Sequence, residues 1–377
     1  MNHLFTIDAP CGQGKTTAMI NYINKNSHEH YVFVTPYLNE VNRIQSQTNC
    51  IEPLKNTKLL NLQQLLNERK NVVTTHALFS DFDKIVIPKD YILIIDESVE
   101  IINSIPMYYS DIKLILSSLG NLDDKNYLHW KDKDYHGCFN QIKSLSERNK
   151  IVLHNKTFYN IIPFRVFDNF KEVYLLTYLY DSQLIRYYFD MFGVANTPLY
   201  VSENFELQNE KVEYKKSLTR IKIYKGKIND IGNEDYSLSK SWYEKATPQQ
   251  MKLLYNNLYN FYRNHRYKHI RNDFMWTSFA DYREQLEQSG YKNAFVACNI
   301  RATNDYVDVH NIAYLINCYP NPFYSSFFDN FDEDKYALSE LLQFIFRSSV
   351  RTRMGDEVKL YVPSKRMREL LEDYMYA

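Results

Sequence analysis

The chain has 377 residues, in which 45 basic side chains balance 45 acidic ones. Its length is enough for two domains, each with a buried core. A balanced charge excludes a generally basic nucleic-acid-binding chain, so a surface of that kind would have to be local. No segment approaches about 18 consecutive apolar residues and no charged leader precedes an apolar run, so we expect a soluble, cytoplasmic protein without a membrane span.

Cysteine spacing gives no sign of a structural metal or of a disulfide framework. The sequence contains no C-x-x-C pair, which is the spacing that zinc ribbons use. The cysteines are scattered and odd in number: Cys11, Cys50, Cys138, Cys298 and Cys318. We therefore expect neither a zinc ribbon nor a set of disulfides.

Short apolar strands alternate with helical segments in the first half of the chain. Continuously apolar strands that are separated by helices are typical of a parallel sheet covered on both faces. The expected strands are Leu4–Ile7, Tyr31–Thr35, Val72–Thr75, Tyr91–Asp96 and Val173–Leu176.

A Gly-containing loop follows the first of these strands. Residues 9–16 read A-P-C-G-Q-G-K-T, the pattern of a phosphate-binding P-loop with Ala in the first position. Gly12 and Gly14 lack a Cβ, so the loop can wrap tightly and aim its N–H groups at a phosphate. Lys15 would neutralise the β- and γ-phosphate oxygens, and Thr16 would offer its hydroxyl to Mg²⁺. The predicted nucleotide-binding residues are Pro10, Cys11, Gly12, Gln13, Gly14, Lys15, Thr16 and Thr17.

An acidic pair ends the fourth strand. Asp96 lies at the strand end, where its carboxylate could hold Mg²⁺ directly or through water. Glu97 follows it and would polarise the attacking water as a general base. An ordinary capped strand end is the alternative, but it would leave the P-loop without a metal partner. The pair also argues against a chance Gly-rich turn at residues 9–16, so we predict a site that hydrolyses ATP with Mg²⁺.

The pattern changes in the middle of the chain and then resumes. Residues 101–170 are polar and helical in part, so we expect an accessory insertion there. A second alternation begins after about residue 215 and has no P-loop of its own. Its expected strands are Ile221–Tyr224, Phe274–Thr277, Ala294–Cys298, Ala313–Asn317 and Val358–Val362, and its expected helices are Gln249–Tyr262, Asp281–Ser289 and Lys335–Ser348.

Three long polar side chains interrupt an apolar stretch near the end of this second half. Gln343, Arg347 and Arg351 recur at intervals of four, which would place them along one face of a helix. A γ-phosphate presented across a cleft would explain them, because a guanidinium binds its oxygens with two donors. A solvated helix face is the alternative. We favour the catalytic interpretation of these three residues.

Together these elements resemble the superfamily 2 (DExD/H-type) helicases, in particular the small helicase-like ATPases of bacteriophages and mobile elements. Asp96-Glu97-Ser98-Val99 looks like the DExx motif of that family. The sequence departs from the family's pattern in two places. Tyr178 replaces a small residue. Near the end of the chain, Phe346 replaces a Gly, and the second arginine, Arg351, comes one residue later than in the family. Which arginine acts as the finger therefore stays open. The other similar segments are Thr35–Leu38, Thr74–His76, Leu176–Tyr178, Phe274–Thr277, Asn299–Asn304 and Gln343–Arg347 with Arg351.

The resemblance implies an α/β protein of two RecA-like parallel-sheet P-loop domains, residues 1–200 and 215–377, with a helical insertion at about 101–170 in the first. It implies ATP in the cleft between the domains. It also implies that five residues contact nucleic acid: Thr35, Pro36, Thr75, His76 and Thr303. For His76, a buried or capping role is an equally good interpretation.

The function implied by the resemblance is an ATP-dependent helicase or translocase. It would act on single- or double-stranded nucleic acid, with DNA favoured, during replication or recombination of a phage-like element. Replication or recombination proteins would be its partners. Two alternatives stay open: a DNA-packaging ATPase, and an ATP-gated loader or binding protein that does not unwind.

Overall fold

The computed structural model describes residues 3–212, 215–268, 273–298, 305–352 and 355–376. Its chain forms two compact units. The first comprises residues 1–8, 16–209 and 321–331, and the second comprises residues 9–15, 210–320 and 332–377. Within the described ranges, no helix is both long and apolar enough to cross a bilayer.

The first unit is built on a sheet with the strand order β12-β11-β1-β10-β4-β2-β3 in the described residues. Every neighbouring pair is parallel except β11 and β12, which are antiparallel. The strands are β1 (His3–Asp8), β2 (His30–Thr35), β3 (Val72–Thr75), β4 (Tyr91–Asp96), β10 (Glu172–Thr177), β11 (Asn196–Val201) and β12 (Leu207–Gln208). The strands expected in the first half of the chain are thus confirmed, and β11 and β12 extend the sheet beyond them.

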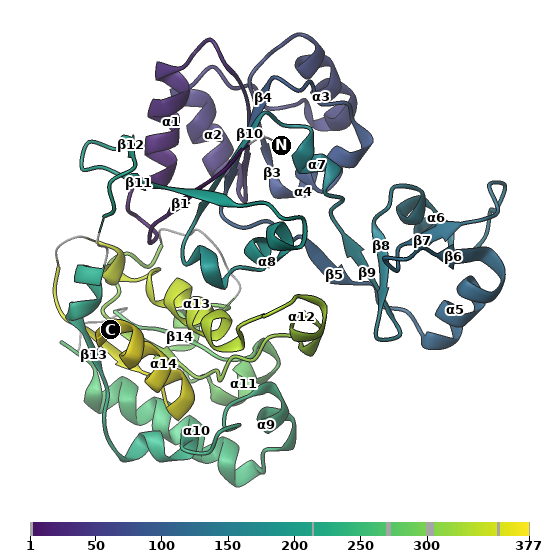
Figure 1. Ribbon diagram of the computed structural model, residues 1–377. Helices are drawn as coiled ribbons and strands as arrows, with labels where there is room; N and C mark the ends of the chain where they lie inside the picture. The colour runs from purple at the N-terminus through teal and green to yellow at the C-terminus, as the bar shows by residue number, and fades with distance from the viewer. Residues whose placement is uncertain (1–2, 213–214, 269–272, 299–304, 353–354, 377) are drawn as a thin grey trace. The chain divides into compact units, whose positions relative to one another are not determined.

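Both faces of this sheet are buried. Successive side chains of a strand point to opposite faces, and in β4 Leu93 and Ile95 belong to one core while Ile92 and Ile94 belong to another. Two helices cover one face (Figure 1): α1 (Lys15–Lys25) and α2 (Leu38–Gln47). The other face packs against α3 (Lys58–Asn67), α4 (His76–Phe79), α7 (Arg165–Asp168) and α8 (Leu184–Met191).

The insertion has a small core of its own, centred on Ile112, Leu128, Ile142 and Phe158. It contains helices, as predicted, and also short antiparallel strands in the orders β5-β9-β8 and β6-β7, which we did not foresee. Its elements are β5 (Ile102–Ser104), α5 (Tyr109–Leu114), β6 (Gly120–Leu122), β7 (Leu128–Trp130), α6 (Asn140–Glu147), β8 (Ile151–His154) and β9 (Thr157–Ile161). The following helix α7 already packs in the core of the main sheet.

A short segment from the second half of the sequence also belongs to the first unit. This segment, residues 321–331, carries helix α12 (Pro322–Phe327) and packs against the insertion. The ring of Phe323 stacks on that of Tyr159, with their centroids 3.6 Å apart. Nε2 of His154 lies 2.9 Å from the hydroxyl of Ser326.

The second unit is built on a parallel sheet with the order β13-β16-β15-β14 in the described residues. Its strands are β13 (Ile221–Ile223), β14 (Met275–Thr277), β15 (Asn311–Tyr314) and β16 (Val358–Tyr361). Its helices are α9 (Lys240–Lys245), α10 (Pro248–Asn260), α11 (Arg283–Leu286), α13 (Glu333–Ile345) and α14 (Lys365–Tyr376). Two parallel α/β sheets, with an insertion in the first unit, confirm the predicted fold class.

One expected strand, Ala294–Cys298, is wrong. Its start is a 3₁₀ turn, and it pairs with β14 only through a single bridge between Phe295 and Trp276. The two rings pack edge to face with their centroids 4.9 Å apart. Packing on Trp276 covers this apolar segment in part without a ladder of backbone hydrogen bonds. A run of apolar residues does not by itself tell such a packed segment from a strand.

A buried ion cluster attaches the insertion to the first sheet. Asp83 follows α4, and its side chain is 1% exposed. It accepts from Nη1 of Arg148 at 3.0 Å and from Nζ of Lys150 at 3.2 Å, and both cations lie between α6 and β8. Nζ of Lys150 also donates to the carbonyl of Ser80 at 2.6 Å. Burial lowers the pKa of Lys150, which the neighbouring Asp83 carboxylate opposes.

Replacing Asp83 with Ala should lower the free energy of unfolding by about 3–5 kcal/mol, because it leaves Lys150 charged and without its carboxylate in a buried site. Asp90→Ala is the matched control. Asp90 pairs with Arg69 at 3.2 Å but its side chain is 46% exposed, so we expect a loss below about 1 kcal/mol. Urea unfolding of both variants measures the difference, and equal losses would contradict a cluster that holds the insertion in place.

Candidate nucleotide site

The predicted P-loop connects β1 to α1. Gly12 and Gly14 have φ values of 82° and 83°, in the left-handed region that glycine tolerates and most residues avoid. The amide of Gln13 donates to the carbonyl of Pro10 at 3.3 Å, which closes the turn. Nζ of Lys15 donates to the carbonyls of Ala9 and, at 3.2 Å, of Pro10, so the lysine is turned into its own loop.

The neighbouring predicted contacts differ in their exposure. Cys11 is half-buried, whereas Gln13 is buried. The hydroxyl of Thr17 accepts from Nη2 of Arg43 at 2.8 Å, which ties α1 to α2. The described ranges contain no group of three or more His, Cys, Asp or Glu side chains that could hold a metal ion.

The two residues predicted to hold Mg²⁺ lie together. The hydroxyl of Thr16, on the first turn of α1, donates to Oδ2 of Asp96 at 2.9 Å. Asp96 is the last residue of β4 and is buried. Since β1, β10 and β4 are parallel, their carboxyl ends share one edge of the sheet, and this edge brings the start of α1 next to Asp96.

Glu97 adopts an unusual backbone conformation. Its φ is 62°, a left-handed value that costs energy for a residue with a side chain and is concentrated at functional sites. Its amide donates to the carbonyl of Leu176 at 2.8 Å, at the end of the adjacent strand β10. The hydroxyls of Ser98 and Thr177 lie 3.5 Å apart. The acidic pair is therefore fixed to the end of β10, within the Leu176–Tyr178 segment.

Asp8 is a residue of this edge that the sequence analysis missed. It ends β1, directly before the P-loop. Its carboxylate accepts from the amides of Leu179, at 2.7 Å, and Tyr180, at 2.9 Å. Leu179 has a φ of 57°, so Asp8 stabilises a strained turn after β10. The available signal was an acidic residue at the strand end before the loop.

The predicted nucleic-acid contacts are placed unevenly. Thr35 is fully buried, and its hydroxyl has no hydrogen-bond partner among the described residues. Its side chain is therefore not exposed on the surface, where a contact with nucleic acid would need it. Pro36 and Thr75 are half-buried. Nε2 of His76 lies 2.9 Å from the carbonyl oxygen of Asp96, which links this histidine to the β4 end. Thr303, with residues 299–304, lies outside the described residues.

The predicted helix face of Gln343, Arg347 and Arg351 is wrong. Helix α13 ends at Ile345, and Arg351 lies in a separate 3₁₀ turn, Ser349–Arg351. Ser348 separates the two elements: its hydroxyl donates to the carbonyl of Ile345 at 2.7 Å and accepts from the amide of Val350 at 3.3 Å. A serine hydroxyl can replace the helix's own backbone hydrogen bonds in this way, so serine is more favourable at the end of a helix than in its interior.

The two arginines consequently have different surroundings. Arg347 is buried, and its guanidinium donates to the carbonyls of Ala297 at 3.3 Å and Cys298 at 2.8 Å. Arg351 is half-exposed and lies against the P-loop, because a Cβ built on Gly12 would be 3.0 Å from its Nε. Gln343 on α13 is half-exposed. The structure thus brings Arg351 to the loop and binds Arg347 to the main chain.

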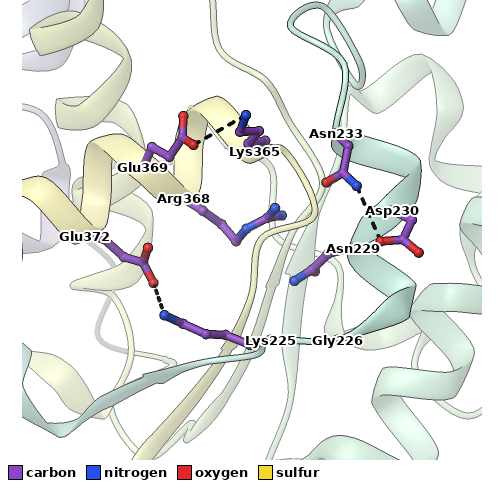
Figure 2. A pocket seen from close by; sticks show the side chains of 9 residues that line it. All are labelled: Lys225, Gly226, Asn229, Asp230, Asn233, Lys365, Arg368, Glu369 and Glu372. Carbon is purple, nitrogen blue, oxygen red and sulfur yellow. Dashed lines mark hydrogen bonds and ion pairs between the residues drawn. The ribbon is translucent and has the colours of Figure 1, made fainter.

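A hollow of about 630 Å³ opens elsewhere on the second unit, between α14 and the 3₁₀ helix Lys227–Gly232 (Figure 2). Its charges pair internally: Lys225 with Glu372 at 2.9 Å, and Lys365 with Glu369 at 3.7 Å. None of the predicted site residues lines it. The lining residues are Lys225, Gly226, Asn229, Asp230, Asn233, Lys365, Arg368, Glu369 and Glu372.

Solved structures define the class of fold. A solved XPD helicase superimposes with a TM-score of 0.53 and 13% identity, covering 98% of this chain and 95% of that one. Xpd4 of S. tokodaii gives a TM-score of 0.52 and 13% identity, covering 100% of this chain and 94% of that one. The chain therefore shares the fold of these two solved structures.

Relatives at the sequence level define the family. The model of the YonV C-terminal Rossmann-like domain matches residues 215–375, and that of the YonV middle domain matches residues 102–160. The SPbeta prophage-derived uncharacterized protein YonV of Bacillus subtilis (strain 168) is 34% identical over 410 residues, covering 100% of this chain and 99% of that protein. The chain belongs to the YonV family.

Replacing Arg347 with Ala should destabilise the protein by about 2–4 kcal/mol, because two partly buried carbonyls lose a charged donor and the buried arginine side chain is removed. Arg351→Ala, at a half-exposed position, should cost less than about 1 kcal/mol. Thermal unfolding of the two variants in parallel checks this difference. If Arg347→Ala unfolds like the parent protein, the main-chain contacts of Arg347 do not stabilise it.

Proposed function

We propose that this protein is an ATP-dependent helicase or translocase that acts on nucleic acid, with DNA favoured, in replication or recombination of a phage-like element. The observation that carries the proposal is the 2.9 Å hydrogen bond between Thr16 and Asp96, which joins the P-loop helix to an acidic strand end. A helicase fold and a prophage-derived relative support the same assignment.

The residues of the site fit ATP and Mg²⁺. Thr16 and Asp96 present a hydroxyl and a carboxylate at one place, and Mg²⁺ prefers such oxygen ligands. Bound Mg²⁺ would neutralise charge on the β- and γ-phosphate oxygens. Lys15 now donates to carbonyls of its own loop, and it would exchange them for phosphate oxygens when nucleotide binds.

Glu97 would act as the general base. Its backbone is held in the left-handed conformation by the hydrogen bond to Leu176, which fixes where the side chain begins. Its carboxylate would accept a proton from the attacking water. Arg351, which lies against Gly12, would add positive charge near the γ-phosphate. We assign the finger role to Arg351 because Arg347 is bound to main-chain carbonyls.

A connection leads from this site to the neighbouring strand end. Asp8 holds the turn at Leu179 and Tyr180, and Ser98 contacts Thr177. A change at the P-loop or at the acidic pair would therefore act directly on the loop after β10. Coupling of hydrolysis to nucleic-acid binding needs such a shared element, which both sites can bias.

ATP hydrolysis should be stimulated by single-stranded or duplex nucleic acid and lost on mutation of the site. Lys15→Ala should lower the rate by about 10²-fold or more, because it removes a phosphate-stabilising charge, and Glu97→Gln by about 10²–10⁴-fold. Phosphate release, measured with and without DNA and RNA of both forms, checks both. Lys25→Ala, at an exposed lysine of the same helix, is the control and should leave the rate unchanged.

The outcomes separate the alternatives. Hydrolysis without stimulation by any nucleic acid would contradict the helicase assignment and favour an ATP-gated loader. Stimulation by duplex DNA alone, without strand separation, would favour a DNA-packaging ATPase. Full activity of Lys15→Ala would remove the P-loop from the mechanism altogether.

A further inference from the structure

The insertion exposes two adjacent aromatic side chains where α5 begins. Tyr108 is 82% exposed and Tyr109 is 41% exposed, and Leu114 at the other end of α5 is 50% exposed. The insertion has a core of buried and partly buried apolar side chains to which Tyr108, Tyr109 and Leu114 do not belong, so these three residues are not needed to close it. An exposed aromatic pair on a module with a complete core indicates a binding surface.

The ammonium groups of two lysines lie over one of these rings. Nζ of Lys113 lies 4.8 Å from the ring centroid of Tyr109, and Nζ of Lys156 lies 5.5 Å from it. Lys113 is four positions from Tyr109, on the same face of α5, whereas Asp111 is two positions away and faces elsewhere. Among the described residues, neither lysine forms an ion pair with a carboxylate.

The backbone holds Lys156 in this place. It lies in the tight turn between β8 and β9, where Asn155 and Lys156 have φ values of 44° and 63°. Nδ2 of Asn155 donates to the hydroxyl of Ser326 at 3.3 Å, and Nε2 of His154 contacts the same hydroxyl. The turn is therefore anchored to the 321–331 segment, so Lys156 meets Tyr109 because of the fold.

We propose that Tyr108, Tyr109, Lys113 and Lys156 form a surface of the insertion that binds single-stranded nucleic acid, an inference that rests on the proposed function. Proteins of that kind combine aromatic rings, on which bases stack, with cations that follow the backbone phosphates. A protein partner fits less well, because the cores of such interfaces are depleted in lysine.

The test is binding of fluorescein-labelled oligo(dT) and oligo(U) to the full-length protein, followed by fluorescence anisotropy over a range of salt. The double variant Tyr108→Ala with Tyr109→Ala should bind on the order of 10-fold or more weakly, because base stacking is lost. Lys113→Ala with Lys156→Ala should reduce the slope of log K against log salt by about 1.4, which is about 0.7 for each released counterion on a single strand.

Two controls match the chemistry of these changes. Lys131→Ala removes an exposed lysine of the same insertion, and Tyr376→Ala removes a tyrosine that is 79% exposed on α14. Both should bind like the parent protein. All six positions are exposed, so the thermal midpoints should stay unchanged, and hydrolysis of ATP without nucleic acid should persist.

The inference and the proposed function fail separately. If the parent protein is stimulated by nucleic acid but the double tyrosine variant binds it equally well, the surface is wrong and the function stands. If the control variants bind nucleic acid as weakly as the test variants, the loss of binding is not specific to the proposed surface, and the assignment of that surface is wrong. If the parent protein neither binds nor responds to any nucleic acid, both fall.

Discussion

The parallel register of β1, β10 and β4 is the constraint on which the candidate site depends. In this register Asp8 is paired with Thr177, and Leu176 with Asp96. All these residues lie at the carboxyl edge of the sheet, where the P-loop also begins. A slip of one residue would turn Asp96 to the opposite face and remove it from Thr16. The register is kept by the apolar side chains of β4, which alternate between two separate cores.

Much of this edge could be predicted from the sequence because its signals are local. Five apolar strands, a P-loop and an acidic pair each occupy a few consecutive residues, and the fold requires parallel strands to share one edge. The pairing of Thr16 with Asp96 follows from that geometry. Asp8 was missed because its partners, Leu179 and Tyr180, are about 170 residues away and belong to a turn that has no sequence signature of its own.

The wrong prediction of a helix face in the second unit also came from contacts that the local sequence does not reveal. A spacing of four predicted one helix through Gln343, Arg347 and Arg351, but Ser348 ends the helix with its own hydrogen bonds. The correction changes the chemistry as well as the geometry. Two arginines that looked equivalent are divided between a main-chain contact and the P-loop, a difference set by tertiary contacts. Thr35 shows the same limit, since a motif's position in sequence does not reveal whether its hydroxyl is buried.

The insertion is bound from two sides, and the two attachments differ in strength. The ion cluster at Asp83 is buried and joins it to the first sheet. The stack of Phe323 on Tyr159 joins it to residues 321–331, which leave the second unit after Pro320 and return to it at Asp332. Asn321 and Asp332 cap α12 and α13, so little slack chain separates the two elements.

This connectivity bears on how a displacement of residues 321–331 would reach the insertion. If residues 321–331 move, they either carry the insertion with them or lose the stack of Phe323 on Tyr159. Burial of one Phe side chain contributes about 1.5–3 kcal/mol, and an aromatic pair adds about 0.5–1.5 kcal/mol. That is the size of coupling energies between distant sites, which are about 1–3 kcal/mol. The energy of this contact is thus comparable to those coupling energies, whereas the ion cluster attaches the insertion to the first sheet through buried charges.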